Sequence, residues 1–327
     1  MLHIKRFASF EEAIPTWAQI EQQTIYYPFQ ALWYLRLFAK HFSKQEHIYL
    51  LGIYEDEQLL AVGAFELADN SIVFLGTNDV SDTPNLVQDI TDFADLLYMP
   101  NVKQHADVIW ETLFAYFRQE GFFRLLPTYL REDSPSYHYL QTKGQVHQVE
   151  TSPYIRLPSS WEEYLANLSR KHRHELKRKI HRLEAENSYT FEQTPITQDT
   201  FDQFIHLHRL SDPNKAKFMT PSMEKFFWDI ATAEKPLWET QLFNLSLDSN
   251  LVASVMVFVN QTHILLYNSG YNPDYAHFSV GLLSKAFLIQ EAIQQKKHVY
   301  DFLRGNERYK YDLGAVDLPL FSIEINI

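Results

Sequence analysis

Residues 59–74 read LLAVGAFELADNSIVF, and residues 251–266 read LVASVMVFVNQTHILL. The two stretches align without a gap. In each copy a polar turn precedes an apolar run, and a polar break then precedes another. A period of this kind indicates an internal repeat, and the alternation indicates strands. The pattern predicts a three-stranded meander that occurs twice, with strands near 48–54, 59–67 and 72–76 and again near 240–247, 251–259 and 263–269.

Helical periodicity surrounds both meanders. Helices are expected before them at 10–22, 29–41, 200–209 and 222–232, and after them at 107–120 and 280–297. A strand closes each half, at 122–126 and 299–303, and one opens each, at 2–7 and 189–193. A helix between two strands implies a crossover to a parallel neighbour. We therefore expect an α/β fold of mixed sheets in two tandem domains, 1–152 and 153–327. The second begins with a long amphipathic helix over 161–186.

Bulk composition excludes several classes of protein. The 327 residues are 46% hydrophobic and include no cysteine, which excludes disulfides, thiolate metal sites and a cysteine nucleophile. The N-terminus lacks a signal-peptide core, and no apolar run reaches the roughly 20 residues of a membrane span. The net charge of −12 argues against DNA binding. We expect a cytoplasmic protein.

The helix expected at 161–186 is locally basic. Seven Lys or Arg and one acid lie between Arg170 and Arg182. Arg170, Arg173 and Lys177 share its outer face, where they would contact an anionic donor or acceptor; the alternative is a solvated face. The pairs His172/His174 and His206/His208 are spaced i,i+2, so their members point to different faces. We expect no metal.

Four segments carry a resemblance to a known family: FQALWYLRLFAKHF (29–42), FLGTNDVSD (74–82), the stretch 153–184, and YDFLRGNERYKYDLGA (300–315). Together they resemble the CelD-type acetyltransferases, a tandem branch of the GNAT acyltransferase superfamily that is related to the FemABX transferases. The resemblance implies two tandem GNAT-like acyl-CoA N-acyltransferase domains. It implies a donor site in the second and a supporting role for the first. Asp79 and Asp82 fall where acceptor contacts arise in such a fold, or serve a turn.

In the resembled fold the acyl donor lies where two parallel strands separate, here 262–269 and 299–303. The resemblance therefore places Asn268 and Ser269 at the donor, near backbone N–H groups that would bind the thioester carbonyl. The pyrophosphate would lie at the next helix start, at Ser279, Val280 and Gly281, because helix N-termini bind anions. The usual loop has an Arg or Gln and two glycines, whereas this one has a single glycine. The alternative is that Ser279 is a plain N-cap.

The segment 301–315 holds the candidate catalytic groups. Asp301 ends a strand and could act as general base, or could form an ion pair with Arg304 or Arg308. Lys310 occupies the slot where GNAT enzymes often carry a tyrosine that protonates the leaving thiolate, and Tyr309 beside it is a second candidate acid. Arg304 and Arg308 could clamp a phosphate or a sugar carboxylate. Tyr267 would face the acceptor or pack in the core.

Three functions remain open at this point. The first is transfer of an acyl group from acetyl-CoA or another acyl-CoA to an amine or hydroxyl of a sugar, polysaccharide or glycolipid-type acceptor. The second is FemABX-like transfer from charged tRNA, which the acidic body opposes. The third is a degenerate fold that only binds a ligand.

Overall fold

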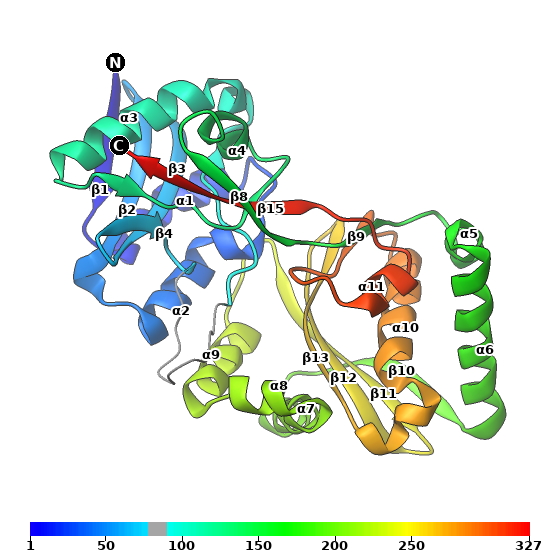
Figure 1. The fold of residues 1–327 in the computed structure, drawn as a ribbon. Coiled ribbons are helices and arrows are strands. Elements are labelled where there is room, and N and C mark those ends of the chain that lie inside the picture. The colour runs from blue at the N-terminus through cyan, green and yellow to red at the C-terminus, as the bar shows by residue number, and fades with distance from the viewer. Residues whose placement is uncertain (78–89) are drawn as a thin grey trace. The chain divides into compact units, whose positions relative to one another are not determined.

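A computed structural model describes residues 1–77 and 90–327 of the chain (Figure 1). Asp79 and Asp82 lie outside the described residues. By its internal contacts the chain divides into a first unit, Met1–Glu150 with Leu318–Ile327, and a second unit, Thr151–Asp317. The expected boundary placed residues 318–327 in the other half. They belong to the first unit because their strand pairs there, with Ile325 opposite Leu125.

The first unit is a mixed sheet with helices. Its sheet runs in the order β1-β2-β3-β4-β6-β15-β7, with β5 paired to β3 and β8 to β15. Its strands are β1 (Leu2–Phe7), β2 (Ile48–Glu55), β3 (Gln58–Ala68), β4 (Ser71–Phe74), β5 (Leu97–Tyr98), β6 (Arg124–Leu125), β7 (Leu130–Arg131), β8 (Gln145–Thr151) and β15 (Pro319–Asn326). Its α-helices are α1 (Phe10–Glu21), α2 (Leu32–Phe42), α3 (Ala106–Gln119) and α4 (Pro135–Leu140).

The second unit repeats this plan around a sheet of order β10-β11-β12-β13-β14-β9. Its strands are β9 (Tyr154–Arg156), β10 (Tyr189–Thr194), β11 (Glu239–Leu247), β12 (Asn250–Val259), β13 (His263–Tyr271) and β14 (Val299–Asp301). Its α-helices are α5 (Trp161–Asn167), α6 (Arg170–Glu186), α7 (Gln198–Ser211), α8 (Pro213–Phe218), α9 (Pro221–Thr232), α10 (Val280–Gln294) and α11 (Arg308–Asp312). The repeated meander and the mixed α/β fold are confirmed: β2-β3-β4 corresponds to β11-β12-β13.

The expected single helix over 161–186 is two helices. Helix α5 ends at Asn167, its C-cap Leu168 has an extended backbone (ψ 147°), and Ser169 is the N-cap of α6. The Ser169 hydroxyl accepts a hydrogen bond from the His172 N–H at 3.2 Å, which satisfies a free donor of the new helix. A serine at this point therefore breaks a periodicity that otherwise continues.

Two helices cover opposite faces of the second sheet. Leu283 and Phe287 of α10 pack in one cluster with Val255 and Val257 of β12. The other face meets α7 at Gly270, where an added Cβ would lie 2.1 Å from the backbone nitrogen of His208. Glycine is therefore required there for helix and strand to approach this closely.

Within residues 1–77 and 90–327, no helix is both long enough and apolar enough to cross a membrane.

Candidate functional site

Strands β13 and β14 are parallel and separate after three residue pairs. Pairing runs from His263 opposite Val299 to Leu265 opposite Asp301. Strand β13 continues to Tyr271, whereas the chain after β14 turns away, and the Phe302 N–H donates to the Pro153 carbonyl at 2.9 Å. The expected separation of the two strands is therefore present, and the later part of β13 has no pair in β14.

A cavity of about 590 Å³ lies at this separation, within the second unit. We call it the α10 cavity. Strand β13 contributes Ser269 and Tyr271 to its wall. The beginning of α10 and the segments around it contribute the rest: Lys179, Ser211, Asp212, Lys215, Ala276, Ser279, Gly281, Leu282, Lys285, Glu307 and Tyr309.

The start of α10 forms one end of this cavity. Ser279 has a left-handed backbone (φ 61°), and its hydroxyl makes no capping bond to α10. The hydroxyl instead accepts a hydrogen bond from the Lys179 ammonium at 2.8 Å. Ser279 therefore does hold the N-cap position of α10, but its side chain bonds Lys179 and does not cap the helix. Val280 is buried, so only its backbone is available, and the first N–H groups of a helix have no intrahelical partner. A lysine and a helix start together suit an anion.

Two lysines line the α10 cavity, of which Lys285 is buried and Lys215 is half-buried. Lys285 is 4% exposed, and burial lowers its pKa to about 7, with the charge of nearby Lys215 adding to the effect. The Lys285 ammonium lies 5.9 Å from the centre of the Tyr309 ring. Lys215 donates to the Ser269 carbonyl at 2.6 Å, and burial lowers its pKa as well. The wall of the cavity therefore holds two amines whose charged forms are disfavoured by burial, together with the acids Asp212 and Glu307.

Asp301 and Lys310 do not line the α10 cavity. Asp301 accepts hydrogen bonds from the Ser152 hydroxyl at 3.0 Å and from the Leu303 N–H at 2.8 Å. Lys310 is 2% exposed and donates to three backbone carbonyls of the turn after β14, with Glu307 2.9 Å away. These carbonyls belong to Leu303, Arg304 and Gly305. Both side chains therefore hold the turn in place.

Tyr309 is the candidate catalytic residue that does reach the cavity. Burial first, and then the negative charge of Glu307, raise the pKa of its phenol far above the ordinary value. The ring packs edge-on against Phe302, with centroids 6.0 Å apart. A phenol that stays protonated at every physiological pH can donate a proton but cannot act as a base.

A second cavity of about 320 Å³, which we call the α6 cavity, adjoins the first. Lys179 and Leu282 line both cavities. Arg308 and Lys171 add positive charge to the wall of the α6 cavity. Arg308 is exposed and lies 3.9 Å from Asp312, whereas Arg304 is half-buried and lines neither cavity.

The other predicted contacts lie elsewhere. Arg170 and Lys177 are exposed, Arg173 donates to the Ala166 carbonyl at 3.1 Å, and none of the three lines either cavity. Tyr267 packs between the rings of Phe227 and Phe258. Asn268 accepts from the Ser269 N–H at 2.8 Å.

Sequence reasoning missed Lys179, Lys215 and Lys285. A signal existed for two of them. Lys285 is the cation in an otherwise apolar helix, VGLLSKAFLIQEAI, and such a residue is rarely buried without a role. Lys179 borders the apolar stripe of α6, and that stripe faces the body of the protein.

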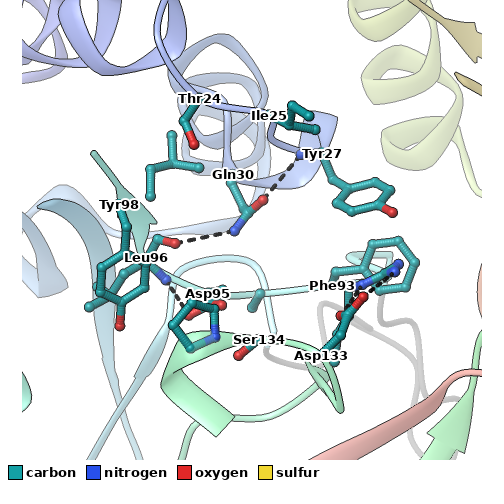
Figure 2. Close-up of a pocket in the computed structure, with 14 residues that line it drawn as sticks. Thr24, Ile25, Tyr27, Gln30, Phe93, Asp95, Leu96, Tyr98, Asp133 and Ser134 are labelled. Carbon is teal, nitrogen blue, oxygen red and sulfur yellow. Dashed lines mark hydrogen bonds and ion pairs between the residues drawn. The ribbon is translucent and has the colours of Figure 1, made fainter. Parts of the chain in front are cut away.

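A further cavity of about 280 Å³ lies in the first unit (Figure 2). Its polar groups largely satisfy one another. The Gln30 amide bonds the Tyr27 N–H and the Leu96 carbonyl, and Arg131 pairs with Asp133 at 3.1 Å. Burial raises the pKa of Asp95 to about 6, although hydrogen bonds from Ser136 and Ser134 oppose this. These bonds fix the segment around residues 93–98.

Metal ligands do not cluster in the described part of the chain, where no three His, Asp or Glu side chains are placed to share an ion.

Comparisons with known proteins give the fold of the whole chain and the family that one part of its sequence matches. The tandem GNAT fold is shared over nearly the whole chain with FemX, with a TM-score of 0.61 at 10% identity, covering 98% of this chain and 96% of that one. A tandem GNAT protein from the clavulanic acid biosynthesis pathway gives 0.51 at 10%, covering 99% and 98%. The C-terminal domain (DUF2156) of a putative lysylphosphatidylglycerol synthetase from Agrobacterium fabrum gives 0.59 at 11%, covering 96% and 92%.

In sequence, residues 170–311 match the acetyltransferase (GNAT) domain family. No curated protein matches the chain. The matched segment runs from α6 to α11 and so contains every residue that lines the α10 cavity.

Proposed function

We propose that the second unit transfers an acyl group from acetyl-CoA or another acyl-CoA to an amine or hydroxyl. The observation that carries this proposal is the α10 cavity. It lies where β13 and β14 separate and at the start of α10, inside the segment that matches the GNAT domain family. The first unit, whose own cavity is internally bonded, serves as support.

The residues of the cavity suit distinct parts of such a donor. The N–H groups at Val280 and Gly281, with the Lys179 ammonium, would hold the pyrophosphate. The part of β13 beyond its pairing with β14, which brings Ser269 to the cavity wall, would face the thioester carbonyl. There one N–H donor to the developing oxyanion is worth about 2.7–4 kcal/mol. Tyr309 would give its proton to the leaving thiolate.

The resemblance to CelD-type enzymes favours a saccharide or glycolipid-type acceptor. Acyl-CoA donors favour a cytoplasmic setting. Asp301 and Lys310 would act by holding the turn that carries Arg304 and Gly305. They would thereby keep β13 and β14 apart. This role differs from the general base and acid first predicted for them.

Calorimetry with acetyl-CoA tests the proposal. We expect binding by the natural protein and at least about tenfold weaker binding by Lys179→Met, which removes a charge-assisted contact worth about 1.5–3 kcal/mol. Lys177→Met is the matched control, because Lys177 lies on the same helix, is exposed and lines neither cavity. An absence of heat with acetyl-CoA, or equal losses in both variants, would contradict the donor site.

A second candidate donor is an aminoacyl-tRNA. The α6 cavity favours it, because Lys171 and Arg308 line that cavity, and Lys177 and Arg178 are exposed on the same helix. Binding of tRNA through phosphates would weaken steeply with salt. Salt-sensitive tRNA binding with no response to acetyl-CoA would favour this donor.

A further inference from the structure

Lys285 is a buried lysine in the wall of the α10 cavity. It lies in the second turn of α10, is 4% exposed, and lines the α10 cavity. Within residues 1–77 and 90–327 its ammonium makes no hydrogen bond or ion pair, and it lies 5.9 Å from the centre of the Tyr309 ring. A buried ammonium without a counter-ion is costly, and an anion bound beside it would offset that cost.

The acids of the cavity are already engaged. Glu307 lies 2.9 Å from the Lys310 ammonium, and Asp212 caps α8 by accepting from the Asn214 N–H at 2.7 Å. Lys215 donates to the Ser269 carbonyl, and its positive charge cannot neutralise that of Lys285. Two lysine amines therefore line the cavity, and among the described residues neither has a carboxylate in contact.

We propose that Lys285 binds a carboxylate of the substrate, so that the transferred acyl group or its acceptor is acidic. This inference rests on the proposed function. Lys285 lies six residues beyond Ser279, which is about 9 Å along the helix axis. Its anion is therefore separate from the phosphates expected at the helix start. The carboxylate comes either from a dicarboxylic acyl chain or from an acidic acceptor.

Proton uptake accompanies this binding. Burial holds the Lys285 pKa near 7, so part of the free protein carries a neutral amine, and a bound carboxylate favours the ammonium. Affinity for the carboxylate should fall about tenfold per pH unit above that pKa. The other titratable groups that line the cavity are Lys179, Asp212, Lys215, Tyr271, Glu307 and Tyr309.

Calorimetry with succinyl-CoA and butyryl-CoA tests the donor source, because these thioesters have equal chain length and differ by one carboxylate. The acceptor source is tested with CoA present, by comparing glucuronate with glucose. In one of these pairs we expect the acidic compound to bind about tenfold to a hundredfold more tightly than its neutral counterpart. Proton uptake should appear as a dependence of the binding heat on the ionisation heat of the buffer. Lys285→Met should abolish the preference, and Lys285→Arg should keep it without proton uptake.

Equal affinities within both pairs, without proton uptake, would overturn the inference and leave the proposed function intact. A preference that survives in folded Lys285→Met would overturn it too. If no CoA thioester binds the natural protein, the proposed function fails and this inference fails with it. The comparison in the natural protein holds whether or not the variants fold.

Discussion

The ammonium of Lys310 lies 2.9 Å from the carbonyl oxygen of Gly305, in the turn that follows β14. Two further carbonyls and the Glu307 carboxylate complete its surroundings. This turn includes Leu303 and Gly305, which both have positive φ (57° and 111°). A single buried cation thus fixes the backbone that leads away from β13.

Replacing Lys310 should destabilise the protein. In Lys310→Met the three carbonyls lose a shared donor, so we expect the free energy of unfolding to fall by about 3 kcal/mol. Urea denaturation measures the change. Arg308→Met, at an exposed position two residues away, is the control and should change stability by less than about 0.5 kcal/mol. Normal stability with lost catalysis would instead support the acid role first predicted for Lys310.

Replacing Asp301 distinguishes a structural role from the role of general base. As a fixed acceptor for Ser152 and Leu303, it should tolerate replacement by Asn better than by Ala. We expect Asp301→Ala to cost about 1–3 kcal/mol of stability and Asp301→Asn to cost less, with CoA binding retained. A folded, CoA-binding Asp301→Asn variant without any transfer activity would favour a general base.

Tyr309 should affect turnover more than binding. Tyr309→Phe removes the proton donor, and we expect CoA release to slow by roughly a hundredfold while the affinity for acetyl-CoA is unchanged. A thiol reagent follows this release cleanly, because the chain contains no cysteine. Amino sugars serve as trial acceptors. Tyr311→Phe is the control, since its hydroxyl donates to Asp317 outside the cavity. Equal rates for both variants would exclude Tyr309 as the acid.

Lys285 should make stability depend on pH. Its pKa is about 7 in the folded protein and 10.5 in an ordinary setting, so between these values the unfolded chain binds more protons. Stability should therefore rise with pH across this window, and the cost of burying the charge is fully present below pH 7. We expect Lys285→Met to be more stable at pH 7 by roughly 2–4 kcal/mol, with the gain shrinking toward pH 10. Denaturation at a series of pH values measures this, and a constant difference would contradict it.

The fold was largely predictable because the repeat carries it. Apolar alternation over 59–67 and 251–259 places β3 and β12, and the pattern continues from β13 through α10 to β14 in order. Two features were not readable. Ser169 interrupts a continuous apolar stripe by a local hydrogen bond, and β15 pairs with residues almost 200 positions earlier, which periodicity does not encode.

The site was predictable in position and less so in chemistry. Ser279, Gly281 and Tyr309 do line the α10 cavity. Arg173 was predicted to contact a ligand and Lys310 to act as the acid, yet both side chains bond backbone carbonyls. Cations satisfy the ends of helices and turns as readily as they bind substrates. Which of several lysines faces a cavity depends on side-chain direction in three dimensions.

Hydrogen exchange with and without acetyl-CoA tests most directly whether a donor enters between β13 and β14. We predict that saturating acetyl-CoA slows exchange in the segment 266–283, which spans the unpaired end of β13 and the start of α10, and leaves residues 48–68 of the first unit unchanged. Saturating binding with no protection in 266–283 would contradict the account.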